Sequence, residues 1–204
     1  MKRLAQQDIN TPEEFKVDIN KKPDWFDEKR WKAMLKPYKG GNLLDIGCGI
    51  SPICKKAMKK SPGSDIRGID FCQEIIDFMK QKHPQGNYIC AGLDYLQTIE
   101  NDYFNYIISG QLIEHLEDVA GFVKETMKIL KPGGVLSIST PLGETEAGEL
   151  DKERHLWSFS VQDVVDLLKP YGKVKIQVLR SDYYPIYRYY FPHIIAFCRK
   201  NGNN

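Results

Sequence analysis

The stretch Leu43–Ser51 reads LLDIGCGIS, and the architecture predicted for the chain follows from it. Its first half is apolar, as in a buried strand. Gly47 and Gly49 then allow a sharp turn and a close approach of the backbone to a ligand, because glycine has no Cβ. Ser51 is a good helix N-cap residue, and Pro52 suits the first helical position. The stretch therefore predicts a strand, a glycine loop and a helix, with a small nucleotide-like ligand at the loop.

The charges around this loop indicate which ligand it suits. A nicotinamide dinucleotide site has a third glycine and turns helix N–H groups toward a pyrophosphate. Pro52 stands at that third position and has no N–H, and Asp45 would repel a pyrophosphate but suit a positively charged ligand. The loop resembles the first motif of the class I S-adenosylmethionine-dependent methyltransferases, which is an acid, any residue, then G-x-G-x-G. Only the third glycine differs, since Ser51 replaces it.

The resemblance covers roughly residues 40 to 140 and implies S-adenosylmethionine as the cofactor, with S-adenosylhomocysteine as the product. It places four residues of the first motif beside the cofactor: Asp45, Gly47, Cys48 and Gly49. It also places the leading helix, predicted over 24–36, across the cofactor, although packing is the favoured interpretation of Trp25 and Trp31.

Composition sets broad limits. With 204 residues the chain is long enough for one α/β domain. A net charge of +2 and 42% hydrophobic residues argue against an obligate nucleic-acid binder. Five cysteines without C-x-x-C spacing argue against a disulfide framework and a zinc site. The first residues lack an apolar signal region, and no stretch has the ~18 apolar residues of a membrane span. We expect a cytoplasmic protein without a membrane partner.

Strands alternate with helices along the chain. Residues 1–23 are predicted to be a loose N-terminal arm, and 24–204 a single methyltransferase domain. After the first strand, six more are predicted over 65–70, 87–91, 103–109, 135–139, 173–179 and 193–198. Amphipathic helices over 71–82 and 119–130, and one that begins at Ser160, separate several of them. This order predicts an α/β fold with a doubly wound, seven-stranded, mostly parallel sheet whose last strand is antiparallel.

Ligands of such sheets bind at the carboxyl ends of the strands. Asp70 lies about 20 residues after the glycine loop, where an acid accepts hydrogen bonds from ribose hydroxyls. The resemblance makes Asp94 an acceptor for the adenine amino group. For both acids the alternative is a helix cap. The remaining cofactor residues that the resemblance implies are Phe71, Leu93, Gly110 and Gln111.

Methyl transfer to a hydroxyl or amine needs a base for the acceptor proton, and histidine is suited to this near neutral pH. His115 follows the fourth predicted strand, beside the expected methyl group. His155 lies between the fifth strand and the last helix, in a segment that forms part of the acceptor pocket in the family. We predict His115 and His155 as catalytic residues. The alternative for His115 is a partly buried side chain that fixes its helix.

Glu114 and His115 also resemble the end of an E-x-x-E-H motif. This motif holds a divalent ion in ubiquinone-biosynthesis O-methyltransferases and in methyltransferases that act on the ends of small RNAs. Here Gln111 replaces its first glutamate. A neutral amide is a poorer ligand for a hard cation, so no metal site is predicted.

Two further segments bear on the acceptor. The aromatic segment 183–192, YYPIYRYYFP, suits a pocket for an aromatic or lipid-like acceptor, an interface, or an ordinary hairpin, and the sequence leaves these open. The loop before the last helix is acidic and predicts a solvated face. If it covers the acceptor, it disfavours nucleic acid. Its acids are Glu144, Glu146, Glu149, Asp151 and Glu153.

Together these features predict an S-adenosylmethionine-dependent methyltransferase with a small-molecule acceptor, O-methylation being favoured over N-methylation. They also allow a homodimer. Two alternatives stay open: an adenosyl-binding domain that acts with a partner protein without catalysis, and a methyltransferase for RNA or protein. Pro52 and Asp45 disfavour a nicotinamide oxidoreductase.

Overall fold

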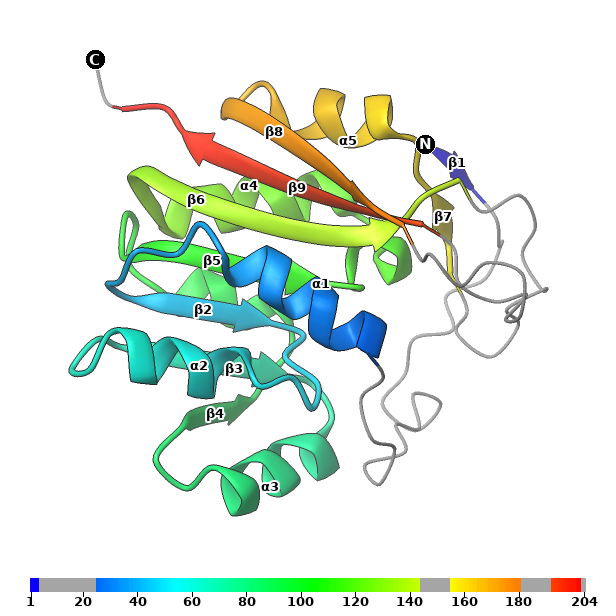
Figure 1. Ribbon diagram of the computed structural model, residues 1–204. Helices are drawn as coiled ribbons and strands as arrows, with labels where there is room; N and C mark the ends of the chain where they lie inside the picture. The colour runs from blue at the N-terminus through cyan, green and yellow to red at the C-terminus, as the bar shows by residue number, and fades with distance from the viewer. Residues whose placement is uncertain (4–24, 144–154, 181–191, 203–204) are drawn as a thin grey trace.

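The main sheet of the protein has seven strands in the order β4-β3-β2-β5-β6-β9-β8 (Figure 1). The computed structural model describes residues 1–3, 25–143, 155–180 and 192–202. The strands of this sheet are β2 (Leu43–Ile46), β3 (Ile66–Asp70), β4 (Asn87–Cys90), β5 (Phe104–Gly110), β6 (Leu130–Pro141), β8 (Gly172–Leu179) and β9 (His193–Lys200). The predicted seven-stranded α/β sheet is thereby confirmed.

The order in which the chain adds strands to the sheet reverses between β2 and β5. β2 is parallel to both β3 and β5, so the chain first builds outward to β4 and then returns to the other side of β2. β9 is antiparallel to both of its neighbours, β6 and β8, as predicted for the last strand. Ligands of open α/β sheets bind where the order reverses, which here is the carboxyl end of β2 and β5.

Helices cover both faces of the sheet (Figure 1). On one face lie α1 (Trp25–Leu35), α2 (Ile53–Lys60) and α3 (Gln73–Lys82), whose apolar residues share one buried cluster. On the other lie α4 (Val119–Ile129) and α5 (Val161–Leu168). Two short 3-10 helices, η1 (Leu93–Thr98) and η2 (Ile113–His115), follow β4 and β5.

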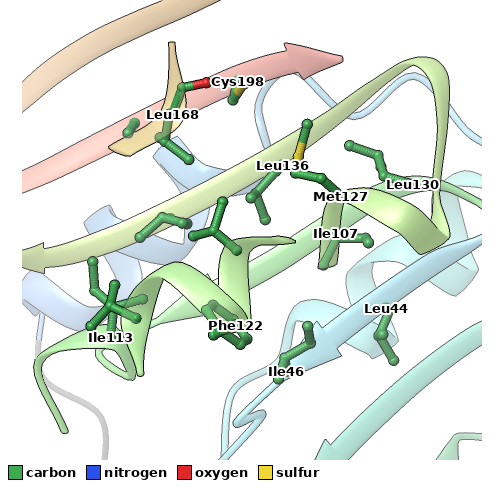
Figure 2. Close-up of a cluster of buried hydrophobic side chains, with 14 of the residues drawn as sticks. Leu44, Ile46, Ile107, Ile113, Phe122, Met127, Leu130, Leu136, Leu168 and Cys198 are labelled. Carbon is green, nitrogen blue, oxygen red and sulfur yellow. Dashed lines mark hydrogen bonds between the residues drawn. The ribbon is translucent and has the colours of Figure 1, made fainter. Parts of the chain in front are cut away.

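The core under α4 shows why the sequence folds in this way. Phe122 and Met127 of α4 lie over Ile107 of β5 and Leu136 of β6 (Figure 2). These side chains are at most 5% exposed, so each contributes about 1.5–3 kcal/mol by leaving water. The α5 helix starts with the capping box that its sequence predicts, because the Ser160 hydroxyl and the Asp163 carboxylate each bond the other's backbone N–H.

Helix α1 is fixed on the sheet beside the glycine loop. The Tyr106 hydroxyl of β5 donates to the Met34 carbonyl at 2.6 Å, and both side chains are buried. The Tyr38 hydroxyl, just after the helix, donates to the Gly41 carbonyl at 2.6 Å. These two bonds hold the end of α1, so the side chains on its first turns have a defined place near β2.

A second, two-stranded sheet was not predicted. β1 (Lys2–Arg3) pairs antiparallel with β7 (Trp157–Ser158). The predicted loose arm therefore begins with two residues of strand. Backbone groups make this pairing, and a strand of two residues is too short to show an alternation of apolar and polar side chains in the sequence. The rest of the predicted arm, residues 4–23, lies outside the described residues.

Replacement of Gly68 in β3 tests the close packing behind the glycine loop. A Cβ at this position would lie 2.9 Å from the Tyr88 ring and 3.2 Å from the Cys48 sulfur. We expect Gly68→Ala to lower the free energy of unfolding by about 1–3 kcal/mol in urea denaturation, as overpacking does. The control Gly202→Ala has no atom within 4 Å and should leave stability unchanged. Equal stability of the two variants would contradict this packing.

Candidate active site

The glycine loop has a backbone that only glycine adopts readily. Gly47 has φ +66° and Gly49 has φ +48°, both in the left-handed region. The neighbouring strand holds the loop, because Cys48 N donates to the Ile69 carbonyl at 2.9 Å. Cys48 itself is buried, and burial raises the pKa of its thiol, so it packs as a small side chain. The loop therefore forms a rigid edge at the carboxyl end of β2.

Asp70 joins this loop to the next helix. Its Oδ2 accepts from Gly49 N at 3.0 Å, and its Oδ1 accepts from Cys72 N, just before α3, also at 3.0 Å. Burial raises its pKa, and the backbone donors oppose that rise. Each carboxylate oxygen has a further lone pair, so Asp70 can still accept from a ligand hydroxyl. Asp70 is not the N-cap of α3, which is Cys72, so its bonds hold the segment before the helix and leave the predicted role as a ligand acceptor open to it.

An apolar cavity of about 330 Å³ lies between the ends of β2, β3 and β5. Apolar side chains such as Ile69, Ile75 and Leu112 provide most of its wall. We call it the apolar cavity. The predicted cofactor residues that line it are Gly47, Gly49, Asp70, Phe71, Leu93, Gly110 and Gln111. Asp94 is not among the lining residues, and it is exposed on η1.

A second cavity, of about 210 Å³, lies between α1 and the glycine loop. We call it the α1 cavity. Its wall contains a cation, Arg30, and two acids, Asp27 and Asp45, whereas the ionisable residues in the wall of the apolar cavity are Asp70 and His115. The two cavities share Gly47, Gly49 and Gly110, so they meet at the loop. The other predicted residues that line the α1 cavity are Asp45 and Cys48.

Arg30 is the residue that the sequence analysis missed. Its Nη2 donates to Asp27 Oδ1 at 2.8 Å, and its side chain is only 12% exposed. Its Nε is buried and has no hydrogen-bond acceptor. A buried donor without an acceptor costs about 1–3 kcal/mol, which an anionic ligand in the cavity would recover. The helix pattern shows which residues form α1 but not that Arg30 faces the loop.

Asp45 is the buried acid of the loop motif, and it is 2% exposed within β2. Burial raises its pKa to about 7; the Ser51 hydroxyl opposes this rise, and the nearby charge of Asp70 adds to it. The Ser51 hydroxyl donates to Asp45 Oδ2 at 2.9 Å. The prediction that Ser51 caps the helix is wrong, because α2 begins at Ile53 with Pro52 in the N-cap position. The Ser51 oxygen also accepts from Ile53 N, the first residue of α2, at 3.4 Å.

Gln111 directly follows β5 and has a strained conformation. Its φ of +56° is uncommon for a residue other than glycine, and such residues concentrate at functional sites. Its N–H donates to the Ser139 carbonyl of β6 at 2.8 Å, which holds the strained residue in place. The turn directs the chain from β5 into η2.

The two predicted catalytic histidines lie together. The ring centroids of His115, on η2, and His155, just before β7, are 4.8 Å apart at 74°, and each side chain is 8% exposed. Leu156 N donates to the Glu114 carbonyl at 2.7 Å, which holds the two segments together. His115 also lines the apolar cavity. His115 therefore stands at the wall of the cavity that begins at the glycine loop, whereas His155 packs against His115 and is not among the residues that line it.

Glu114 adds a carboxylate to this pair. It is fully buried, and the Thr140 hydroxyl donates to its Oε2 at 3.0 Å. Ligand atoms of Glu114, His115 and His155 all lie within 4.8 Å of one another, so the three could hold a metal ion. Two imidazoles and a carboxylate suit zinc and other transition metals. The prediction of no metal rested on Gln111, whereas the fold adds His155, a distant residue, to the donors.

Comparisons with known proteins agree with this fold. Residues 44–138 match the family described as methyltransferase domain. The ubiquinone biosynthesis O-methyltransferase of Bartonella tribocorum is 29% identical over 133 residues, which is 62% of this chain and 48% of that protein. A methyltransferase structure from Archaeoglobus fulgidus aligns with TM-score 0.67 and 17% identity over 84% of this chain and 94% of that one.

Residues 44–138 thus match a methyltransferase domain, and the chain has the fold of a solved S-adenosylmethionine-dependent methyltransferase.

A further solved structure aligns with this chain. Phosphoethanolamine N-methyltransferase 2 of Haemonchus contortus, crystallised with S-adenosyl-L-methionine, aligns with TM-score 0.66 and 16% identity over 86% of this chain and 53% of that one. The chain spans about half the length of the curated relative from Bartonella.

Some predicted features of this protein lie outside the described residues. They are the aromatic residues 183–191 and the acids Glu144, Glu146, Glu149, Asp151 and Glu153. Within the described part of the chain, no helix combines the length and apolar character needed to span a membrane.

Replacement of Asp45 tests its buried, protonated state. A pKa raised in the folded protein gives stability that is present at low pH and lost as pH rises through the folded pKa, here about 7. Relative to Asp45→Asn, we expect the wild-type free energy of unfolding to fall by about 3 kcal/mol between pH 5 and pH 8 in urea titrations. Asp77→Asn, on the exposed side of α3, is the control. A constant difference across this range would contradict the assignment.

Proposed function

We propose that this protein transfers a methyl group from S-adenosylmethionine to a small-molecule acceptor, with a hydroxyl oxygen favoured over a nitrogen. The observation that carries the proposal is the junction of an apolar and a charged cavity at the glycine loop, with His115 on the wall of the apolar one. An adenosyl amino acid has the same two parts, an apolar nucleoside and a charged amino-acid end.

The apolar cavity suits the nucleoside. Phe71 and Leu93 line it and offer apolar contacts, while Asp70 can accept from ribose hydroxyls. The positive φ of Gly47 and Gly49 lets the backbone approach the ligand between the two cavities. Asp94 stays a predicted acceptor for the adenine amino group, although it lies on η1 outside the cavity wall.

The α1 cavity suits the amino-acid end. Arg30 has a buried Nε that needs an acceptor, and a carboxylate supplies one with the matching charge. Asp45 lies on the same wall and matches an ammonium group. A residue pair of opposite charge on one wall fits a zwitterion better than a pyrophosphate. This fit supports the proposed cofactor over a dinucleotide.

Bound S-adenosylmethionine supplies a methyl group on a sulfonium, which is already a good leaving group. The protein then has to orient the acceptor, exclude water and take a proton. Orientation can contribute ~7 to 11 kcal/mol. We infer that His115, which lines the apolar cavity, and His155, whose ring contacts it, accept the proton of an acceptor hydroxyl, since imidazole is basic near neutral pH. Similarity to ubiquinone O-methyltransferases supports oxygen as the acceptor atom.

A second chemistry is favoured by one observation, the convergence of Glu114, His115 and His155. A divalent cation held by these residues would lower the pKa of the acceptor hydroxyl and would replace the free base. The metal-free base remains the first proposal, in line with the neutral Gln111. The two chemistries make opposite predictions for a chelator.

Other parts of the proposal rest on the sequence alone. They are a cytoplasmic location and a homodimer, with neither nucleic acid nor a membrane as partner. The rival functions are an adenosyl-binding domain that serves a partner protein and a methyltransferase for RNA or protein. Cofactor binding without turnover would favour the first, and binding to RNA with steep salt dependence would favour the second.

Replacement of Arg30 tests the cofactor site. We expect micromolar binding of S-adenosylhomocysteine to the wild type in titration calorimetry, and binding at least tenfold weaker in Arg30→Met, about 1.4 kcal/mol. Lys29→Met removes the same charge from the exposed side of α1 and should bind normally. Loss of binding in both variants would point to net charge rather than to this contact. Absence of binding to the wild type would refute the cofactor.

Replacement of the histidines tests the chemistry. With tritiated S-adenosylmethionine and a panel of phenols, His115→Ala and His155→Ala should each lower kcat by about 10²–10⁴-fold, as loss of a general base does. S-adenosylhomocysteine affinity should be retained. His83→Ala, at the end of α3, is the control and should keep wild-type kcat.

A chelator then separates base from metal. The metal-free base predicts full activity after dialysis against EDTA. Activity that disappears with EDTA and returns with zinc or magnesium would instead assign Glu114, His115 and His155 to a cation.

A further inference from the structure

Ser51 stands where the family motif has its third glycine, and it makes a bond that glycine cannot make. Its hydroxyl donates to Asp45 Oδ2 at 2.9 Å. Both side chains are buried, Ser51 at 6% and Asp45 at 2% exposure, and both line the α1 cavity. The substitution thus places a donor against the one acid of the motif.

The surroundings of Asp45 make this donor important. Four titratable side chains interact electrostatically with Asp45. They are Asp70 of β3, Cys48 of the loop, Cys54 of α2 and Tyr88 of β4. Each of these is neutral or negative at neutral pH. The cation on the same wall, Arg30, is paired with Asp27. In the described part of the chain, the Ser51 hydroxyl is the one side-chain donor that bonds this carboxyl.

We propose that Ser51 is a positioning residue that holds the Asp45 carboxyl at the α1 cavity, so that this carboxyl receives the ammonium group of the cofactor's amino-acid end. This inference rests on the proposed function. With Oδ2 bonded to Ser51, Oδ1 keeps its lone pairs for the ligand. Without the hydroxyl, Asp45 would have to ionise while buried and close to Asp70. Among the described residues, no side chain would then donate a hydrogen bond to its carboxylate.

Loss of the Ser51 hydroxyl should change how ligand affinity depends on pH. The Ser51 hydroxyl opposes the rise in the pKa of Asp45, so its removal should leave this acid protonated to higher pH. An ammonium group binds the ionised form. Binding to the wild type should therefore strengthen as pH rises through about 7, and a variant without the hydroxyl should need a higher pH.

A purely structural role makes a different prediction. The Ser51 oxygen also lies 3.4 Å from Ile53 N, at the start of α2. If Ser51 only supports this helix start, its loss should weaken binding by the same factor at every pH. The pH profile of binding therefore separates the two roles.

The experiment is calorimetric titration of S-adenosylhomocysteine into the full chain between pH 5.5 and 8.5 at constant ionic strength. The variants are Ser51→Ala, Ser51→Gly, Ser51→Thr and Asp45→Asn. We expect Ser51→Ala and Ser51→Gly to bind at least tenfold more weakly at pH 7 and to recover toward pH 8.5. Ser51→Thr keeps the hydroxyl and should follow the wild type, while Asp45→Asn should lose this pH dependence. Ser51→Gly restores the motif glycine and covers the case in which alanine disturbs the loop.

Three results would overturn the inference while leaving the proposed cofactor intact. They are wild-type affinity in both Ser51→Ala and Ser51→Gly, weakening that is constant across pH, and a wild-type affinity that does not change with pH. Absence of binding to the wild type at every pH would instead refute the proposed cofactor itself, and with it this inference. The two failures are therefore distinguishable.

Discussion

The site depends on the hydrogen bonds by which β3 holds the glycine loop. Cys48 N donates to the Ile69 carbonyl, and Gly49 N donates to the Asp70 carboxylate. These bonds fix a backbone with two positive φ angles at the point where the strand order reverses. They form only because β2 and β3 are parallel and in register, which places both carboxyl ends at one edge. The core on both faces of the sheet maintains this register.

The residues that pack on each side of the fixed loop determine the character of the two cavities. On one side the apolar ends of β3 and β5 leave a wall suited to a nucleoside. On the other, α1 brings Arg30 and Asp27 against the buried Asp45. The Tyr106 hydroxyl holds α1 in that place from β5. The burial that stabilises the fold thus also raises the pKa of Asp45 and leaves Arg30 Nε without an acceptor, and both groups are suited to a charged ligand.

The sheet could be predicted from the sequence because apolar residues are spaced differently in strands and in helices. The sequence also predicted the placement of Gly47, Asp70 and His115, because the loop motif and the strand ends fix them. Three features escaped it, since each depends on contacts between distant segments. They are the position of Arg30 at the loop, the hydrogen bond from the Ser51 hydroxyl to Asp45, and the approach of His155 to Glu114 and His115. The pairing of β1 with β7 belongs to the same class.

The most direct test of the account is a titration of the ¹⁵N-labelled protein with S-adenosylhomocysteine, followed by amide chemical shifts. The account predicts the largest changes at Gly47, Gly49 and Gly110, which line both cavities. It also predicts smaller changes along β8, at the far edge of the sheet. Unchanged shifts at the three loop-edge amides under saturating ligand, or a maximum on β8, would contradict a cofactor site at the glycine loop.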